Sequence, residues 1–222
     1  TILESKDAVA RFYQEVKVAA QLTHPNIVHA YDAGEDRGFH YLVMEYVPGH
    51  DLAAVLNELG PVPLSMAIDY IGQAANGLDY AHRKGVVHRD IKPSNVLVTH
   101  EGRAKLVDMG LARLHQVQSE SNDLTATGVT LGTFDYISPE QGRDPRAADV
   151  RSDLYSLGCT LYYMLTGEPP YPDRTVLQKL LSHTSDPPPD PRVLRPEIPD
   201  EVAELTLRLL EKRPENRYQR PS

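Results

Sequence analysis

One short stretch of the sequence combines three side chains that could act together on a phosphate: His88-Arg89-Asp90-Ile91-Lys92-Pro93-Ser94-Asn95. The carboxylate of Asp90 could accept the proton of a reacting hydroxyl, and the ammonium group of Lys92 could neutralise developing negative charge. The amide oxygen of Asn95 could bind a metal ion. Because one loop holds all three groups, the sequence predicts a site for phosphate chemistry there.

A second candidate motif, Asp108-Met109-Gly110, directly follows the apolar run Ala104 to Val107. A carboxylate at the end of a strand can hold Mg²⁺, which takes oxygen ligands and usually keeps substrate phosphates in its coordination shell. An isolated aspartate is more often a turn or cap residue. The assignment of Asp108 as a metal ligand therefore depends on the combination of the two motifs.

Hydrophobic periodicity and turn residues predict the elements that must hold these side chains. We expect a first helix over Asp7 to Leu22, ended by His24-Pro25-Asn26, because proline disfavours helical geometry at the residue before it. Two β-rich runs and two helices follow, and the longer helix starts at Ser65 or a neighbour. Their ranges are Ile27 to Tyr31, Phe39 to Val47, Asp51 to Leu59 and Leu64 to Lys84, with a turn-like stretch, Gly34 to Gly38, between the two β runs.

The second half of the chain reads as mostly helical. A loop, Gly85 to Asn95, leads into the short apolar runs Val96 to Thr99 and Ala104 to Val107, and a long polar segment, Asp108 to Glu140, has few periodic apolar positions. A segment of that kind inside a domain is usually functional or mobile. The expected helices are Asp149 to Thr166, Arg174 to His183 and Asp200 to Glu211. A little sheet followed by mostly helix predicts an α+β protein with a small lobe beside a large one.

Composition limits the class of protein. The 222 residues suit one domain or two small ones, and 41% hydrophobic with 24% charged residues is typical of a globular chain. The formal charge of −8 argues against nucleic-acid and anionic-membrane partners, which usually need a basic face. No apolar run is long enough to span a membrane, and no signal peptide is recognisable. We therefore expect a cytoplasmic location, with no membrane contact from this segment, and the cytoplasmic domain of a membrane-anchored protein stays open as an alternative. The start at Thr1 suggests a piece of a longer protein.

Single residues of reactive type are expected to be structural. The one cysteine, Cys159, excludes an intramolecular disulfide, fits a reducing compartment and lies in an apolar helix, where we expect it in the core. His82, His100 and His183 show no metal-ligand spacing and are expected at the surface. The run Pro187-Pro188-Pro189 is interpreted as a stiff connector rather than a ligand for a proline-binding module.

The two motifs, in this order, resemble the catalytic loop and the metal-binding motif of protein kinases. Further stretches resemble that family in register, over nearly the whole chain. They are the helix-C glutamate at Glu15, the strand and hinge at Leu42 to Val47 with Met44 as gatekeeper, the substrate-facing loop at Gly132-Thr133, the end of the activation segment at Ser138-Pro139-Glu140, and the bracing residues Asp153 and Arg217. Lys92 followed by Pro93 is the serine/threonine form, and Glu140-Gln141 with Asn216-Arg217-Tyr218 is similar to bacterial kinases of the eukaryotic type.

The resemblance implies a role for each matched residue. Asp90 would act as base, and Lys92 would steady the transferring phosphoryl group. Asn95 and Asp108 would hold Mg²⁺. ATP would bind with its adenine against the backbones of the hinge and above an apolar floor, and the residues so implied are Glu45 and Val47 in the hinge and Leu97 and Val107 in the floor.

Regulatory and structural roles are implied in the same way. Arg89 would pair with a phosphorylated activation segment, because a phosphate adds about 1.5 to 2 negative charges. The first candidate acceptors are Thr125 and Thr127, followed by Thr130, with Ser119 and Ser121 weaker, and an unmodified loop is the alternative. Glu140 would pair with Arg217, and Asp153 would brace the catalytic loop. Glu15 would be regulatory, or a solvated helix face in the absence of its lysine partner.

The chain departs from the family pattern at its start. No glycine-rich loop precedes the first helix, and no strand supplies the ATP-binding lysine. We therefore expect a bilobal fold with an incomplete N-lobe at residues 1–47 and a mainly helical C-lobe at 48–222 that lacks its last helix. This piece alone is expected to be weak or inactive. Met109 replaces the usual phenylalanine, and methionine fills an apolar slot while remaining flexible.

The expected function is transfer of the γ-phosphoryl group of MgATP to Ser/Thr hydroxyls of proteins, with autophosphorylation in the activation segment. One alternative is a pseudokinase or scaffold that binds partners without chemistry. The other is a small-molecule kinase, which would lack the activation-segment motifs. Protein substrates are the expected partners, and self-association stays open.

Overall fold

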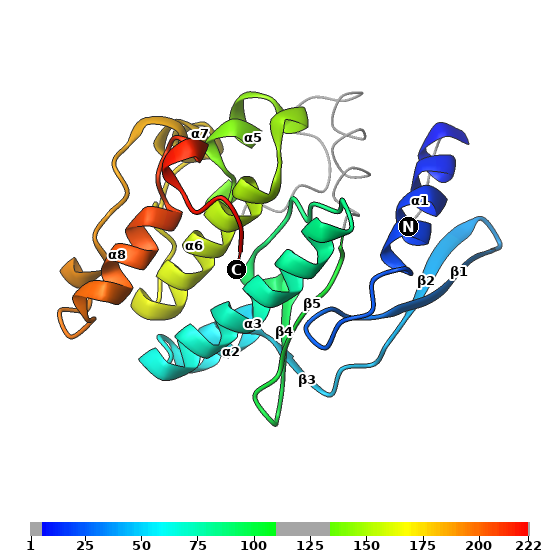
Figure 1. The fold of residues 1–222 in the computed structure, drawn as a ribbon, viewed down its shortest axis with the longest axis horizontal. Helices are drawn as coiled ribbons and strands as arrows, with labels where there is room; N and C mark the ends of the chain where they lie inside the picture. The colour runs from blue at the N-terminus through cyan, green and yellow to red at the C-terminus, as the bar shows by residue number, and fades with distance from the viewer. Residues whose placement is uncertain (1–5, 110–133, 222) are drawn as a thin grey trace.

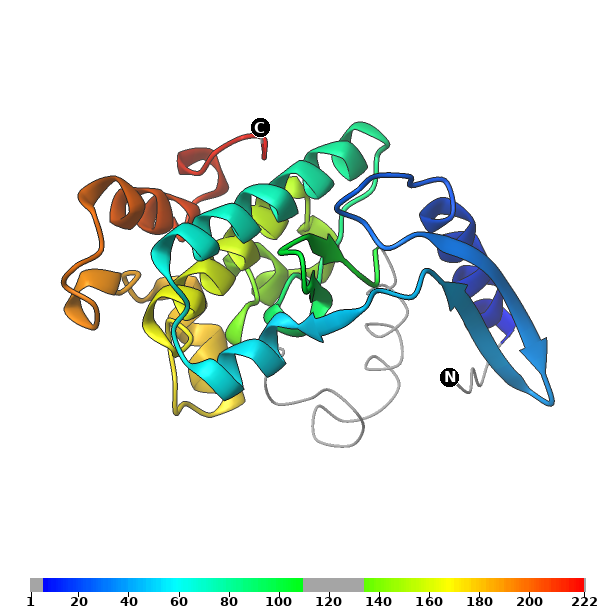
Figure 2. The same ribbon diagram turned by 90° about the horizontal axis from the view of Figure 1, so that it is seen from below.

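The structure is a computed structural model that describes residues 6–109 and 134–221, and its elements form two groups (Figure 1). The smaller group consists of helix α1 (Lys6–Ala19) and the antiparallel strands β1 (Ala30–Asp36) and β2 (Phe39–Met44). Two residues with positive φ, Arg37 at 52° and Gly38 at 82°, turn the chain between the strands. Such a pair matches the right-handed twist of a hairpin. Figure 2 shows α1 lying along one face of this hairpin.

The first strand lies later in the chain than the sequence predicts. Ile27 and Val28 do not pair with β2. Instead they run beside the second sheet, where the amide of Val28 donates to the carbonyl of Leu106 at 2.8 Å. The turn expected over Gly34 to Gly38 is present but shorter, at Arg37 and Gly38, because residues 34 to 36 continue strand β1. The predicted β runs, Ile27 to Tyr31 and Phe39 to Val47, are both rich in apolar residues. The sequence does not say which neighbouring strand each of them will pair with.

The second sheet lies at the edge of the larger group. It has the strand order β3-β4-β5, with β3 (Gly49–Asp51), β4 (Val96–Thr99) and β5 (Ala104–Leu106) all antiparallel. Strand β3 was not expected from the sequence, since three residues are too few to show alternation. Gly49 is required there because a Cβ atom would collide with the carbonyl of Val98. Residues 45–48 connect β2 to this sheet.

Helices make up the rest of the larger group. The helices are α2 (Leu52–Leu59), α3 (Leu64–Arg83), α5 (Pro139–Arg143), α6 (Val150–Thr166), α7 (Val176–Ser185) and α8 (Asp200–Leu209). Short 3-10 turns lie at Pro93–Asn95, Pro145–Ala147, Pro191–Val193 and Pro214–Asn216. Helix α6 is buried on nearly all sides, with α3 packed along it and α8 so close that a Cβ at Gly158 would lie 2.7 Å from the Cβ of Leu209.

The predicted helices are present, with small differences at their ends. Helix α3 begins at Leu64, as predicted, but it starts after Pro63 without a side-chain cap, so the start signal expected from Ser65 or a neighbour is not used. Helix α5 was missed, since it is only five residues long and starts at the end of the polar segment; it begins with a capping box between Ser138 and Gln141. Over the residues that the structure describes, no helix has the length and apolar character needed to cross a bilayer.

Candidate active site

The predicted catalytic side chains meet on one loop. The Nζ atom of Lys92 lies 2.7 Å from Oδ2 of Asp90. The side-chain amide of Asn95 donates to the same oxygen at 3.0 Å and to the backbone carbonyl of Asp90 at 2.8 Å. These contacts orient the Asp90 carboxylate between a cation and an amide. Because its nitrogen faces Asp90, the Asn95 amide turns its oxygen the other way.

A buried carboxylate on α6, that of Asp153, is hydrogen-bonded to the backbone of the catalytic loop. Asp153 is 2% exposed and accepts the backbone amide of His88 at 2.8 Å and that of Arg89 at 2.7 Å. Arg89 has a φ of 70°, a left-handed conformation that non-glycine residues rarely adopt. Burial raises the pKa of the Asp153 carboxyl, and the two amides and the His88 side chain act against that shift. The two hydrogen bonds to Asp153, which we call the brace, therefore hold a strained backbone directly before Asp90.

The second motif is connected to the loop through the backbone. The amide of Val107 donates to the carbonyl of Asn95 at 3.1 Å, and the carbonyl of Val107 lies 2.9 Å from Nε2 of the buried His88. Asp108 follows at once, is exposed, and has a φ of 61°. The strand exit thus brings Asp108 next to the backbone of Asn95.

The chemistry of these donors fits Mg²⁺. Asn95 and Asp108 offer an amide oxygen and a carboxylate, and Mg²⁺ is commonly bound through one or two protein oxygens, with phosphates and water completing its octahedron. Within residues 6–109 and 134–221, no group of three or more His, Cys, Asp or Glu side chains is placed to hold a metal ion by itself. A two-residue site therefore needs phosphate oxygens from a substrate.

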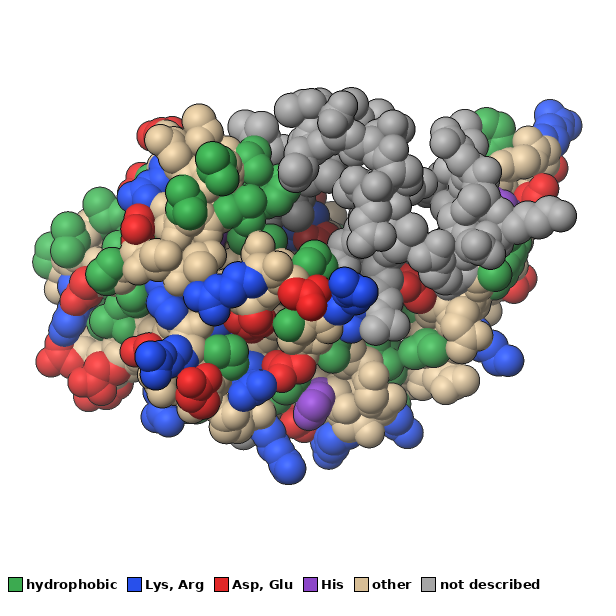
Figure 3. All heavy atoms as spheres, turned by 90° about the horizontal axis from the view of Figure 1, so that it is seen from above, with side chains coloured by type: hydrophobic (Ala, Val, Ile, Leu, Met, Phe, Trp, Pro, Cys, Tyr) green, Lys and Arg blue, Asp and Glu red, His purple; other side chains and the backbone are tan. Residues whose placement is uncertain are grey.

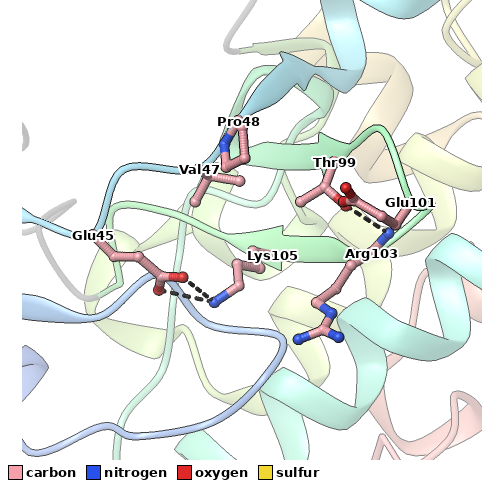
Figure 4. A pocket seen from close by; sticks show the side chains of 7 residues that line it. All are labelled: Glu45, Val47, Pro48, Thr99, Glu101, Arg103 and Lys105. Atoms are coloured by element: carbon pink, nitrogen blue, oxygen red, sulfur yellow. Dashed lines mark hydrogen bonds and ion pairs between the residues drawn. The ribbon is translucent and has the colours of Figure 1, made fainter.

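A partly buried ion pair supports the connecting residues 45–48. The Nζ atom of Lys105, on β5, lies 2.6 and 2.8 Å from the two carboxylate oxygens of Glu45 (Figure 4). The amide of Glu45 also donates to the carbonyl of His29 at 2.8 Å. Burial acts to raise the pKa of Glu45, but the hydrogen bonds from Lys105 and His29 outweigh it, so that this pKa is lowered. A groove of about 310 Å³ opens beside the pair, lined also by Val47 and Pro48.

The two residues predicted as the apolar floor share a sheet face. Leu97 pairs with Lys105 across strands β4 and β5, so their side chains point to the same side. Val107, two residues after Lys105, continues that alternation. Both Leu97 and Val107 are partly exposed, while Val96 is buried in the core. The side chains of Leu97 and Val107 thus lie on the face of the small sheet from which Lys105 reaches residues 45–48.

The predicted structural pair is present beneath α5. The guanidinium of Arg217 binds both oxygens of Glu140, at 2.7 and 2.9 Å, and Ser152 donates to Glu140 at 2.6 Å. Burial acts to raise the pKa of Glu140, but Arg217 and Ser152 outweigh it and that pKa is lowered. The neighbouring Gln141 donates through Nε2 to the carbonyl of Arg89 at 2.8 Å. Helix α5 is thereby tied to the catalytic loop.

Several predicted residues take other positions. Thr125, Thr127 and the remaining candidate phosphate acceptors, together with Gly132-Thr133, lie outside the described residues. Glu15 lies half-buried on α1, so a fully solvated helix face was wrong. Met109 is buried and fills an apolar slot, as predicted, and so is Cys159.

The expectation that His183 lies at the surface was wrong, because it is 1% exposed and its Nδ1 lies 2.9 Å from the hydroxyl of Tyr155. Sequence reasoning also missed Lys105 and Gln141. Lys105 stands in an otherwise apolar strand, which was the available signal. Gln141 was noted only in the resemblance to bacterial kinases, and the capping-box spacing from Ser138 to Gln141 was the available signal for its place in α5.

Comparison with known proteins agrees with this geometry. The family described as protein kinase domain matches residues 2–221. A "probable serine/threonine-protein kinase" of Clostridium acetobutylicum is 40% identical over 97% of this chain and 32% of its own length. The serine/threonine-protein kinase PknB of Mycobacterium leprae is 39% identical, and that of Mycobacterium tuberculosis 38%, each over 94% of this chain and 34% of its own length.

The chain therefore spans about a third of the length of the curated relatives it matches. The match nevertheless covers almost every residue of the chain, including both candidate motifs and the two structural braces. The predicted α+β, bilobal kinase-like fold is confirmed, with a small group of elements beside a mainly helical one. This chain belongs to the protein kinase domain family.

Proposed function

We propose that this chain is the catalytic part of a serine/threonine protein kinase that transfers the γ-phosphoryl group of MgATP to protein hydroxyls. The observation that carries the proposal is the arrangement around Asp90. Its carboxylate is held by Lys92 at 2.7 Å and Asn95 at 3.0 Å, on a loop that Asp153 braces. Phosphoryl transfer depends mostly on positioning and charge neutralisation, and a braced loop with these three groups supplies both.

Each group has a defined part in the proposed reaction. Asp90 accepts the proton of the attacking hydroxyl, and Lys92 stabilises negative charge on the transferring phosphoryl group. Asn95 and Asp108 hold Mg²⁺, which neutralises the nucleotide phosphates when it is bound. The nucleotide base is held by the backbones of Glu45 and Val47, above the side chains of Leu97 and Val107.

Protein Ser/Thr side chains are the proposed acceptors. Lys92 followed by Pro93 supports this choice, as do the names of relatives that are about 40% identical. The intact set Asp90, Lys92, Asn95 and Asp108 argues against a scaffold without chemistry. We also propose autophosphorylation on Thr125 or Thr127, since Arg89 stands directly beside Asp90 and could bind the added phosphate.

We further propose that the domain works in the cytoplasm. Its reaction needs ATP, and a chain with a single cysteine needs no oxidising compartment for disulfide formation. Burial raises the pKa of the Cys159 thiol, so that it stays protonated and unreactive at neutral pH.

The test is phosphoryl transfer by the longer parent protein, supplied with MgATP and myelin basic protein as acceptor. Asp90→Asn should lower the rate by about 10²- to 10⁴-fold, while the KM for ATP stays within about twofold. Asp200→Asn is the matched control, because Asp200 is exposed on α8 and pairs with Arg192. Phosphosite mapping should place label on Thr125 or Thr127. A folded parent whose ATP-dependent labelling is absent, or persists fully in Asp90→Asn, would contradict the proposal.

A further inference from the structure

Helix α7 has an unusual distribution of side chains. Its buried residues are Lys179, Ser182 and His183, all polar, whereas Leu177 is 67% exposed and Leu181 57%. A surface helix normally buries an apolar stripe and turns its polar face to water. In the space-filling view, hydrophobic side chains appear at the surface on the side where α5 and α7 lie (Figure 3). Polar contacts must therefore contribute much of what holds α7 in place.

The polar contacts of α7 reach three parts of the molecule. The Nζ atom of Lys179 lies 2.5 Å from Oδ1 of Asp135, and the two side chains are only 10% and 11% exposed. His183 contacts the hydroxyl of Tyr155 on α6 at 2.9 Å. The carbonyl of Ser182 accepts a hydrogen bond at 3.3 Å from Lys212, which follows α8. Two side chains of α7 reach the segment that precedes α5: Lys179 through its ion pair with Asp135, and His183 through an interaction with the backbone of Asp135.

That segment, residues 134–138, is joined to the catalytic loop at its far end. The carbonyl of Tyr136 accepts a hydrogen bond from Ser156 at 2.7 Å. Ser138 begins α5, and Gln141 of the same helix donates to the carbonyl of Arg89 at 2.8 Å. The segment is thus fixed at Tyr136 and at α5, and Lys179 holds it at Asp135. The segment is therefore connected, through α5, to the loop that carries Asp90, so a shift of the segment can reach the place where an acceptor hydroxyl would bind.

We propose that Lys179 is a positioning residue for the acceptor protein: its buried ion pair with Asp135 fixes segment 134–138 beside the catalytic loop. The inference rests on the proposed function and extends it to a helix outside the catalytic motifs. Removing one partner of a buried ion pair leaves the other charge unpaired in a poorly solvated place, so the segment must move to reach water. Lys179 contacts neither the catalytic side chains nor residues 45–48 in any interaction described above, so nucleotide use should be unaffected.

The test compares Lys179→Met with wild type in the longer parent protein, using MgATP and myelin basic protein. The KM for the acceptor should rise about tenfold, while the KM for ATP and the slow transfer to water stay within about twofold. Lys179→Arg keeps the cation and should recover most of the loss. The double variant Asp135→Asn, Lys179→Met leaves no unpaired charge and should be less impaired than Lys179→Met alone. Lys84→Met, on the exposed end of α3, is the matched control.

Hydrogen–deuterium exchange separates this inference from the proposed function. Lys179→Met should speed exchange at the amides of residues 134–138, with α3 and α6 unchanged, whether or not the parent transfers phosphate. Equal losses for ATP and acceptor, or unchanged exchange in residues 134–138, would refute the positioning role. If wild type shows no transfer although Lys179→Met still loosens the segment, the proposed function fails while the contact itself is confirmed.

Discussion

The guanidinium of Arg217 lies against the carboxylate of Glu140, 77 residues away, and its Nη1 and Nη2 atoms donate to the two carboxylate oxygens at 2.7 and 2.9 Å. Arg217 is 1% exposed and also donates to the backbone carbonyls of Arg151 at 2.8 Å, Glu211 at 2.7 Å and Lys212 at 3.1 Å. One side chain thus joins the start of α5, the start of α6 and the turn after α8. A planar fork with five donors suits this role, and lysine could not reproduce it.

Replacing Arg217 by methionine should therefore destabilise the protein strongly. The change leaves the Glu140 carboxylate buried without its partner, which typically costs about 3–5 kcal/mol in the free energy of unfolding. Urea denaturation followed by circular dichroism measures the loss. Arg217→Lys should recover less than half of it, because several carbonyl contacts stay unmet. An unfolding free energy within about 1 kcal/mol of wild type for Arg217→Met would show that the pair is not structural.

Asp153→Asn should slow catalysis more than it weakens nucleotide binding. A carboxylate can accept both backbone amides of the catalytic loop, whereas an amide side chain presents one oxygen and one repelling N–H group. Arg89 should then relax from its φ of 70° and displace Asp90. We expect kcat to fall about 10²-fold with the KM for ATP within about threefold. Asp69→Asn on the exposed face of α3 is the control, and an unchanged kcat in Asp153→Asn would exclude the brace.

Lys105→Met should weaken nucleotide binding and leave the KM for the acceptor protein unchanged. The substitution removes the cation that orients Glu45 and leaves this carboxylate in the groove beside Val47 (Figure 4). We expect the KM for ATP to rise several-fold and the free energy of unfolding to fall by about 1–3 kcal/mol. Glu45→Gln keeps a hydrogen-bond acceptor and should have the smaller effect. An unaltered KM for ATP in a folded Lys105→Met protein would remove residues 45–48 from the nucleotide site.

The stability of the protein should fall in mild acid because of His183. Burial and the nearby Lys212 lower the pKa of His183 to about 3, against an ordinary value of 6.5. Between these two values the unfolded chain binds a proton that the folded chain does not, so stability decreases as the pH falls through this window. From pH 7 to pH 5 the contribution is about 2 kcal/mol.

Urea titrations at both pH values test this assignment. His183→Gln should lose about 2 kcal/mol less than wild type between pH 7 and pH 5, because glutamine does not titrate. His100→Gln, at an exposed position, should behave as wild type does. A wild-type acid sensitivity that is retained fully in His183→Gln would assign it to another group.

Much of the candidate site could be predicted because its chemistry is local in the sequence. Asp90, Lys92 and Asn95 lie within one loop, and their mutual contacts follow from a few residues of backbone. The helices α3, α6 and α8 were equally accessible, since a helix displays its buried face at a regular spacing along the chain. Residues 110–133, which include the candidate phosphate acceptors, lie outside the described residues.

The tertiary structure alone decided the contacts between distant residues. Lys105 and Glu45 are 60 residues apart, and neither sequence neighbourhood indicates the other. The same holds for Lys179 with Asp135 and for the burial of His183. Residue type favoured exposure for these side chains, because charged and imidazole groups lose hydration when buried. The packing of α7 supplied Asp135 as the partner of Lys179 and Tyr155 as the partner of His183, while strand β5 brought Lys105 to Glu45. Only the folded chain specifies which partners those are.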